Sequence, residues 1–340
     1  MNARPMPLGP VLAAVAGIEL STADRERLVH PLVGGVTLFA RNYADAAQLT
    51  ALCAAIHGLR EPRLLISVDH EGGRVQRFRD GFTRLPPMRS IGALWQRGAS
   101  RARAAAHAVG VVIASELAAC GVDLSFTPVL DLDYGVSSII GDRALHPTPE
   151  VVSELAACLL DGLQEGGMAG VGKHFPGHGY IAADSHLELP VDERGLETIR
   201  ARDLEPFRAL RSRLAAVMAA HVLYPQVDAQ PAGFSQRWIR TILRRDLGYD
   251  GAVVSDDLGM AGAACAGSLE ERAQAAFAAG CDLVLACTPD DADVVLSCLR
   301  YDMPAQSRTR LHAMFGTPAS VVAGAIRVRD ARTLLSSIAT

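Results

Sequence analysis

The sequence predicts an α/β protein folded as a single-domain (β/α)8 barrel that spans residues 1–340. Two observations lead to this fold class. Short apolar runs recur along the chain, bounded by glycine or polar residues, as buried parallel strands are. Segments of helical character lie between them, without a compositional break or a repeat. Eight such units favour closure into a barrel over an open, doubly wound sheet, which is the alternative.

The first predicted strand is also the most ambiguous element. Its sequence, "PVLAAVAG", resembles the core of a signal peptide, but the apolar run from Val11 to Ile18 is short and only Arg4 is basic before it. We therefore expect a buried strand. The eight predicted strands lie within residues 10–17, 34–40, 64–70, 122–131, 170–175, 214–222, 251–257 and 281–287. The first and the sixth are rich in alanine, so a helix is the alternative for both.

The segments between the strands carry helix signals. Apolar residues at three- and four-residue spacing predict helices within 45–59, 100–121, 148–167 and 268–280. Thr148, followed by Pro149, is expected to cap the third of these helices. Ser268 and Glu271 form a capping-box pattern at the start of the fourth, and Gly280 is expected to end it.

Composition limits the classes of partner. Lysine and arginine number 33 against 37 acidic residues, so the formal net charge is −4. The arginine-rich segments 97–103 and 200–213 are interleaved with alanine, leucine and acids, which is typical of solvated helix faces rather than of a nucleic-acid surface. No apolar run approaches the roughly 18 residues of a membrane span. We expect a cytoplasmic monomer that binds neither nucleic acid nor membranes.

The seven cysteines are expected to be free thiols. Their number is odd, no pair has CxxC spacing, and most lie in apolar stretches. Buried thiols in a reducing compartment explain this pattern better than a disulfide framework or a zinc site.

Titratable side chains gather where the predicted strands end. Active sites of such barrels lie at the C-terminal ends of the strands. The ends of the third to seventh strands carry Asp69-His70-Glu71, Asp131, Lys173-His174, His221 and Asp256-Asp257. This agreement among five strand ends predicts an active site at one rim of the barrel.

The segment "GKHFPGHGYIAADSH" (172–186) could hold a metal, cradle a phosphate or serve acid/base chemistry. Pro176 and Gly177 interrupt any helix that would stack the histidines, and HExxH and GK[ST] patterns are absent, so metal and phosphate sites are disfavoured. In an extended segment Asp184 and His186 point to the same side. A carboxylate there would orient the imidazole for proton transfer. A surface salt bridge is an equally good interpretation of the spacing alone.

The sequence resembles glycoside hydrolase family 3, and within it the NagZ type of bacterial β-N-acetylhexosaminidases. The motifs that carry the resemblance are "KHFPGHG" followed by "DSH", joined to "GAVVSDDLGM" (251–260). It extends over nearly the whole chain, including "HPLVGGVTLFARNY" (30–43) and "VDHEGGRVQRFRDGFTRLP" (68–86). The first strand departs from the family pattern, because "LAAVAG" stands where related enzymes often carry acids, and we expect altered packing there but no loss of activity.

The resemblance implies a retaining β-glycosidase that needs no cofactor or metal. By similarity, Asp256 is the nucleophile, His186 is the acid/base, and Asp184 supports His186. The substrate-binding residues implied are Asp69, Arg77, Arg143, Lys173 and His174. Without the resemblance, structural ion pairs would be the preferred interpretation of Arg77 and Arg143.

The resemblance further implies a small glycan substrate. It is a terminal β-linked N-acetylglucosamine, removed from 1,6-anhydromuropeptides during recycling of the cell wall. A phosphorylase that uses phosphate in the second step is the alternative enzyme. A sugar-binding module without activity is disfavoured, because Asp256, Asp184 and His186 are all present.

Overall fold

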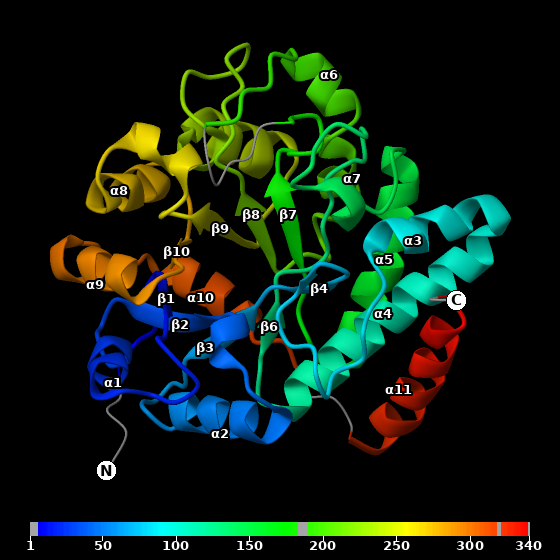
Figure 1. Cartoon of the computed structure of the whole chain (residues 1–340). Helices are drawn as coiled ribbons and strands as arrows, with labels where there is room; N and C mark the ends of the chain where they lie inside the picture. The colour runs from blue at the N-terminus through cyan, green and yellow to red at the C-terminus, as the bar shows by residue number, and fades with distance from the viewer. Residues whose placement is uncertain (1–5, 183–188, 318–320, 339–340) are drawn as a thin grey trace.

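The computed structural model describes residues 6–182, 189–317 and 321–338, with residues 321–326 described as backbone only. Its centre is one sheet of parallel strands, surrounded by helices (Figure 1). The strands follow the spatial order β6-β3-β2-β1-β10-β9-β8-β7. Their bounds are β1 (Val11–Ala14), β2 (Val33–Leu38), β3 (Leu65–Val68), β6 (Leu124–Ser125), β7 (Val171–Phe175), β8 (Ala216–Ala219), β9 (Ala252–Asp257) and β10 (Leu283–Ala286).

The two outer strands of this order, β6 and β7, meet and nearly close the sheet into a barrel. Parallel bridges join Leu124 to Ala169 and Val129 to Lys173. The Leu130 N–H also donates to the Lys173 carbonyl at 2.6 Å. The predicted (β/α)8 barrel is therefore confirmed.

All eight predicted strands are present, including the two alanine-rich ones. Every residue of β1 and β8 is buried, as in a parallel sheet that is covered on both faces, and each strand is hydrogen-bonded to a parallel neighbour on both sides. The fourth strand, β6, is much shorter than the predicted segment 122–131. Pro128 has no N–H to donate, and the chain beyond Ser125 is extended but makes only isolated bridges.

The helices cover the outside of the barrel, and a short hairpin, β4 (His70–Gly72) and β5 (Val75–Gln76), follows β3. The helices are α1 (Thr22–Leu28), α2 (Ala46–His57), α3 (Met88–Ala93), α4 (Ala99–Ala119), α5 (Pro149–Glu165), α6 (Leu196–Ala201), α7 (Leu204–Leu210), α8 (Leu269–Ala279), α9 (Pro289–Cys298), α10 (Ala305–Ala313), α11 (Val321–Ser336) and the π-helix η5 (Arg237–Asp246). Short 3₁₀ turns are η1 (Ala40–Asn42), η2 (Leu94–Arg97), η3 (Gly141–Arg143), η4 (Ala232–Phe234) and η6 (Ala261–Ala266).

Two of the predicted helix ends are confirmed and one cap is not. Ser268 accepts a hydrogen bond from the Glu271 N–H and forms the predicted capping box of α8. Gly280 ends this helix in the left-handed region, with φ of 118°. Pro149 begins α5, but the Thr148 side chain makes no capping hydrogen bond, so its predicted role is wrong.

Helix α4 lies almost within the predicted range 100–121, but it is apolar over a longer stretch than the sequence analysis recognised. By length and composition alone its 21 residues could cross a membrane, with a mean hydropathy of 1.3 over the most apolar window. In the fold, 61% of that window is buried inside the molecule. Figure 1 shows α4 lying between α5 and the C-terminal helix α11. Its apolar surface therefore serves as core.

All seven cysteines are free. Cys53, Cys120 and Cys281 are buried, Cys265 is exposed, and the other three are half-buried. The prediction of free thiols is confirmed, although only three of them are fully enclosed.

Candidate active site

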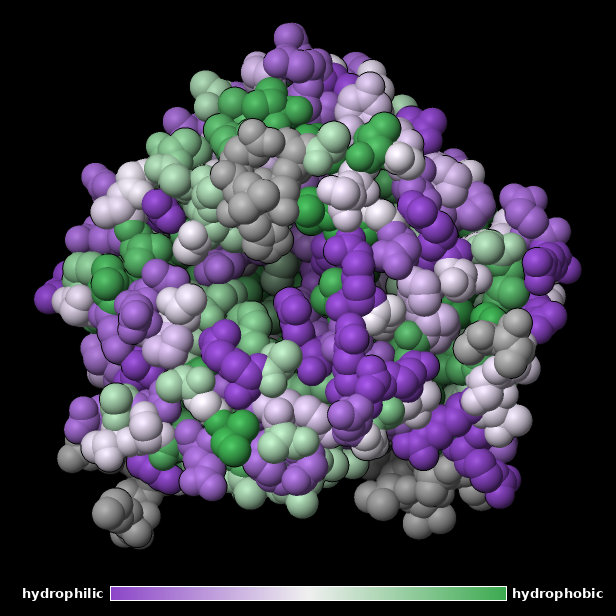
Figure 2. Space-filling view, viewed as in Figure 1, coloured by the Kyte–Doolittle hydropathy of each residue, from purple (hydrophilic) through white to green (hydrophobic). Residues whose placement is uncertain are grey.

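A pocket of about 500 Å³ opens at the C-terminal ends of the strands. Figure 2 shows that this face of the molecule is hollowed near its centre, with hydrophilic side chains gathered beside the hollow. The pocket is lined by six of the eight predicted site residues, which are Asp69, Arg77, Arg143, Lys173, His174 and Asp256. The other two, Asp184 and His186, lie outside the described residues.

Asp256 is the acid at the end of β9. This strand is hydrogen-bonded to β8 on one side and β10 on the other, so its end is well fixed. The half-buried carboxylate accepts a hydrogen bond from the Asp257 N–H at 2.9 Å. Its position allows one oxygen to face a ligand in the pocket.

His221, at the end of the sixth barrel strand, holds the backbone of Asp256. Its ring is fully buried, lies 4.7 Å from the ring of Phe234 (centroid to centroid), and is stacked on it. Burial lowers the pKa of His221, so the imidazole is neutral at neutral pH. Nε2 lies 3.2 Å from the Asp256 carbonyl oxygen and donates its proton there.

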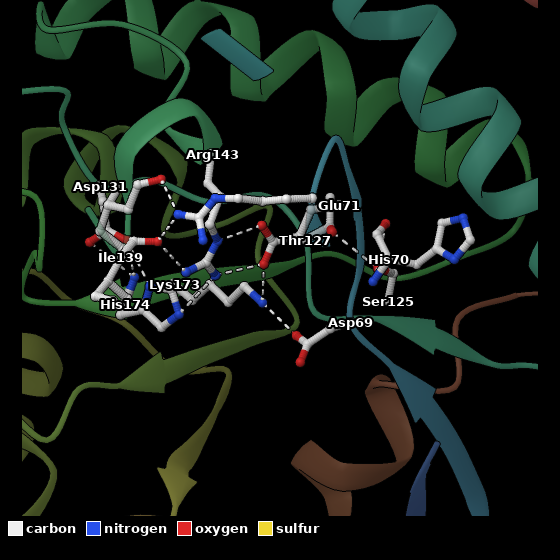
Figure 3. A network of polar contacts seen from close by, with 12 residues as sticks. Asp69, His70, Glu71, Ser125, Thr127, Asp131, Ile139, Arg143, Lys173 and His174 are labelled. Atoms are coloured by element: carbon white, nitrogen blue, oxygen red, sulfur yellow. Dashed lines mark hydrogen bonds and ion pairs between the residues drawn. The ribbon is translucent and has the colours of Figure 1, made fainter. Parts of the chain in front are cut away.

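A buried network of charges lines the wall opposite (Figure 3). Lys173 Nζ lies 2.6 Å from Asp69 Oδ1 and 2.6 Å from Glu71 Oε1. Arg143 donates twice to Glu71, from Nε at 2.8 Å and from Nη2 at 2.7 Å. Arg77 Nη2 lies 3.3 Å from Asp69 Oδ2. Glu71 thus fixes two of the cations that line the pocket, Lys173 and Arg143.

The acids of this network are ionised at neutral pH. Burial alone would raise the pKa of Asp69, but the charges of Lys173 and Arg77 outweigh it and hold that pKa well below its ordinary value. Burial opposes ionisation of Glu71 too, yet Arg143 and Lys173 lower its pKa to about 2. Burial would lower the pKa of Arg143, and the charge of Glu71 raises it instead. The wall therefore offers fixed hydrogen-bond donors and acceptors to a ligand that carries hydroxyl groups on adjacent atoms.

The end of β7 and the turn that follows it are organised around the carboxylate of Asp131. His174 Nδ1 lies 2.7 Å from Asp131 Oδ2, and the His178 N–H donates to Oδ1 at 2.6 Å. Burial would raise the pKa of Asp131, but its interactions with His174 and His178 lower it. Asp131 is thus an ionised acceptor beneath two histidines that line the pocket.

Sequence reasoning placed Glu71, Asp131 and His221 at strand ends without giving them a role. Neighbouring residues of a strand alternate in direction, so Asp257 would point away from Asp256 in a regular strand. Asp257 lines the pocket as well. The register of β10 against β9 shifts between Leu283 and Leu285, and such an irregularity re-aims side chains.

Two arginines, Arg77 and Arg143, each form an ion pair and also line the pocket. Arg77 pairs with Asp69 and Arg143 with Glu71, as the structural interpretation required, and both also line the pocket. The two interpretations that the sequence left open are therefore compatible. In the described part of the chain, no group of three or more His, Cys, Asp or Glu side chains is placed to hold a metal ion.

Comparisons with known proteins agree with this architecture. Residues 11–302 match the family model of the glycosyl hydrolase family 3 N-terminal domain. The chain is 60% identical over 316 residues to a β-hexosaminidase of Thiobacillus denitrificans, with 92% of this chain and 88% of the relative covered. It is 56% identical to a β-hexosaminidase of Nitrosospira multiformis over 92% of this chain and 90% of the relative.

Solved structures show the same relation. The crystal structure of NagZ from Neisseria gonorrhoeae is 47% identical, with a TM-score of 0.93 over 99% of this chain and 100% of the other. A complex of that NagZ with N-trifluoroacetyl-D-glucosamine has a TM-score of 0.94 at the same identity and coverage. The chain belongs to glycosyl hydrolase family 3 and is a glycoside hydrolase of the β-hexosaminidase type.

Proposed function

We propose that the protein is a retaining exo-β-N-acetylglucosaminidase that forms a covalent glycosyl-enzyme on Asp256. Its substrate would be a terminal β-linked N-acetylglucosamine on peptidoglycan fragments, the 1,6-anhydromuropeptides, in cell-wall recycling in the cytoplasm. The observation that carries the proposal is the position of Asp256 on a fixed strand end, in one pocket with Asp69, Arg77, Arg143, Lys173 and His174.

In the first step, an oxygen of the Asp256 carboxylate attacks the anomeric carbon. The bond from that carbon to the glycosidic oxygen breaks, and the leaving oxygen takes a proton from His186. In the second step His186 accepts a proton from water, and the water oxygen attacks the same carbon and releases Asp256. Asp184 orients the imidazole and stabilises its charged form.

Chain length supports the role of His186. His178 lines the pocket, and His186 follows it by eight residues. An extended chain of eight residues spans up to roughly 25 Å, so the spacing in the sequence permits His186 to reach the pocket.

The wall of fixed charges supports a sugar as the ligand. A pyranose presents adjacent hydroxyl groups, each of which can donate one hydrogen bond and accept others. The pocket offers the carboxylate of Asp69 as an acceptor beside the donors Lys173, Arg143 and Arg77. The complex of the Neisseria NagZ with N-trifluoroacetyl-D-glucosamine supports the N-acylated sugar class.

Replacement of Asp256 tests the proposal. We expect Asp256→Asn to lower kcat on an aryl β-N-acetylglucosaminide by roughly 10³-fold or more, because no covalent intermediate forms. Binding of N-acetylglucosamine, measured by calorimetry, should persist. The control is Asp161→Asn, which removes a surface carboxylate paired with Arg213 on the outside of the barrel. Turnover by Asp256→Asn at the level of this control would refute the assignment.

Product analysis separates hydrolysis from the phosphorylase alternative. The hydrolase releases free N-acetylglucosamine at the same rate with or without phosphate. A sugar 1-phosphate that appears only when phosphate is added would overturn the proposed hydrolysis.

A further inference from the structure

We propose that Asp131 is a positioning residue that makes His174 Nε2 a hydrogen-bond acceptor for one substrate hydroxyl group. This inference rests on the proposed function for the identity of the ligand, a sugar. The protonation state that it assigns to His174 is a property of the protein without ligand, so it can be tested even if the proposed function is wrong.

The first step is the geometry of the Asp131 carboxylate. It is fully buried and accepts from three N–H groups, two of His174 at the end of β7 and one of His178 in the turn that follows. The His174 backbone N–H lies 3.2 Å from Oδ2, His174 Nδ1 lies 2.7 Å from the same oxygen, and the His178 N–H lies 2.6 Å from Oδ1. Both carboxylate oxygens of Asp131 thus accept hydrogen bonds from residues 174–178. Figure 3 shows Asp131 beside His174.

The second step is the tautomer of His174. An ionised carboxylate is acceptor-only, so the ring nitrogen beside it carries the proton. The other nitrogen, Nε2, lies 3.5 Å from Arg143 Nη2. A second proton on Nε2 would face that guanidinium, which has only N–H donors. The geometry therefore favours a neutral ring with Nδ1 protonated and a lone pair on Nε2.

The third step is the consequence for recognition. His174 lines the pocket beside three cationic side chains, Lys173, Arg143 and Arg77, all of which can only donate. Together with Asp69, His174 is then an acceptor in that wall. A hydroxyl group near Arg143 and His174 would accept from the guanidinium and donate to Nε2, a pairing that an acceptor-only substituent cannot reproduce.

Asp131→Asn tests this because it changes the hydrogen-bond pattern and keeps the shape. The amide oxygen can still accept from the His178 N–H. The amide NH₂ then faces His174 Nδ1 and donates to it, which moves the ring proton to Nε2. An amide beside a functional histidine is known to stabilise the wrong tautomer in this way.

The matched control is Asp123→Asn, which lies immediately before β6, whereas Asp131 lies beyond its other end. Asp123 is also a buried carboxylate that contacts a histidine, with His57 Nε2 at 3.1 Å, and it accepts from the Ile66 N–H at 2.8 Å. It lines a different cavity from the one that contains Asp256. If the loss of kcat/KM comes only from the disturbance of a buried carboxylate, it will appear in both variants.

The protein readout is the ¹⁵N spectrum of histidine-labelled enzyme, with His174 assigned through its loss in His174→Gln. We expect Nδ1 protonated and Nε2 unprotonated in the wild type and in Asp123→Asn, and the reverse in Asp131→Asn. An Nε2-protonated His174 in the wild type, or an unchanged tautomer in Asp131→Asn, would overturn the proposal. This arm stays decisive even if the enzyme does not cleave N-acetylglucosaminides.

The substrate readout uses aryl β-N-acetylglucosaminides in which the 3-, 4- or 6-hydroxyl is replaced by hydrogen or by fluorine. At one position, fluorine should cost as much as hydrogen in wild-type kcat/KM, because fluorine cannot donate to Nε2. Asp131→Asn should lower kcat/KM on the parent substrate by about ten- to a hundredfold relative to Asp123→Asn, and the penalty at that position should shrink. Equal kcat/KM for the two variants, or partial rescue by fluorine at all three positions, would contradict the assignment.

Discussion

Glu71 connects two cations of the candidate sugar-binding wall, Lys173 and Arg143. It is 2% exposed, pairs with Lys173 at 2.6 Å and receives two hydrogen bonds from Arg143. Removal of this buried carboxylate would leave two cations, Lys173 and Arg143, without a full set of counter-charges. The placement of Lys173 and Arg143 therefore depends on a residue that makes no contribution of its own to the pocket lining.

Glu71→Gln should lower the free energy of unfolding by about 3–5 kcal/mol, because breaking a buried pair leaves uncompensated charge. Urea denaturation at neutral pH measures the change. Glu154→Gln, which removes a half-exposed partner of Arg103, is the control and should change stability by less than about 1 kcal/mol. Equal effects of the two substitutions would show that the network does not stabilise the fold.

The same residue predicts a pH dependence. The pKa of Glu71 is lowered in the folded state to about 2, so its stabilisation is complete above the unfolded pKa and is lost as pH falls toward 2. Between about pH 4.5 and 2, wild-type stability should therefore fall more steeply than that of Glu71→Gln. Parallel stability curves for the two proteins over this range would contradict the lowered pKa.

At this scale, the sequence predicted the residues that face the pocket better than those behind them. Asp69 follows β3 directly, and Lys173, His174 and Asp256 lie in the last residues of β7 and β9, so the rule for barrel strand ends applied to them. Glu71 and Asp131 follow strands as well, but nothing in one sequence says which carboxylate faces a ligand and which faces a neighbouring cation. That distinction arises from contacts between β4, η3 and β7, which are distant in the chain.

Helix caps show how local signals succeed and fail at the scale of elements. Ser268 and Thr148 precede helices in similar sequence contexts, but only Ser268 makes the capping hydrogen bond. Ser268→Ala should reduce the free energy of unfolding by about 1 kcal/mol, whereas Thr148→Ala should change it by a few tenths at most. Chemical denaturation of the two variants checks this, and a larger loss for Thr148→Ala would show that the observed cap geometry is wrong.

The sequence predicted correctly where the barrel strands lie, but it did not predict how long each strand is. Alanine-rich β1 and β8 were ambiguous from periodicity, and their burial between two parallel neighbours settles them as strands. The predicted segment 122–131 contains only the short strand β6, since Pro128 cannot donate to a ladder. The hairpin β4–β5 was not predicted, although it carries Glu71 at one end of the site.

At the scale of the whole molecule, the barrel brings together residues that are widely separated in the chain. Strand order in the sheet follows chain order, with closure between β6 and β7, so each successive strand end adds its side chains to one rim. This is why a correct fold class and a list of strand ends were enough to place Asp69, Lys173 and His174 at this rim, whereas Arg77 and Arg143 were predicted only from the family resemblance. Composition alone was less informative. Helix α4 is long and apolar enough to cross a membrane, but in the fold most of its apolar window is buried inside the molecule.

Thiol reactivity tests the packing of the whole molecule. Cys265 is exposed, and burial raises the pKa of Cys53 to about 12, so Cys53 stays an unreactive thiol. We expect one thiol of the native protein to react quickly with an aromatic disulfide reagent, and seven after denaturation without reductant. Cys265→Ser should abolish the fast phase. Fewer than seven thiols in the denatured protein would contradict the absence of disulfides.

The most direct test of the proposed mechanism is whether a sugar becomes attached to Asp256. The enzyme is mixed with a fluorinated or slowly turned-over N-acetylglucosaminide, quenched, digested and analysed by mass spectrometry. We expect one sugar residue on the peptide that contains Asp256, formed by wild type and absent from Asp256→Asn. An adduct on another side chain, or steady turnover with no adduct under conditions where deglycosylation is slow, would contradict the account.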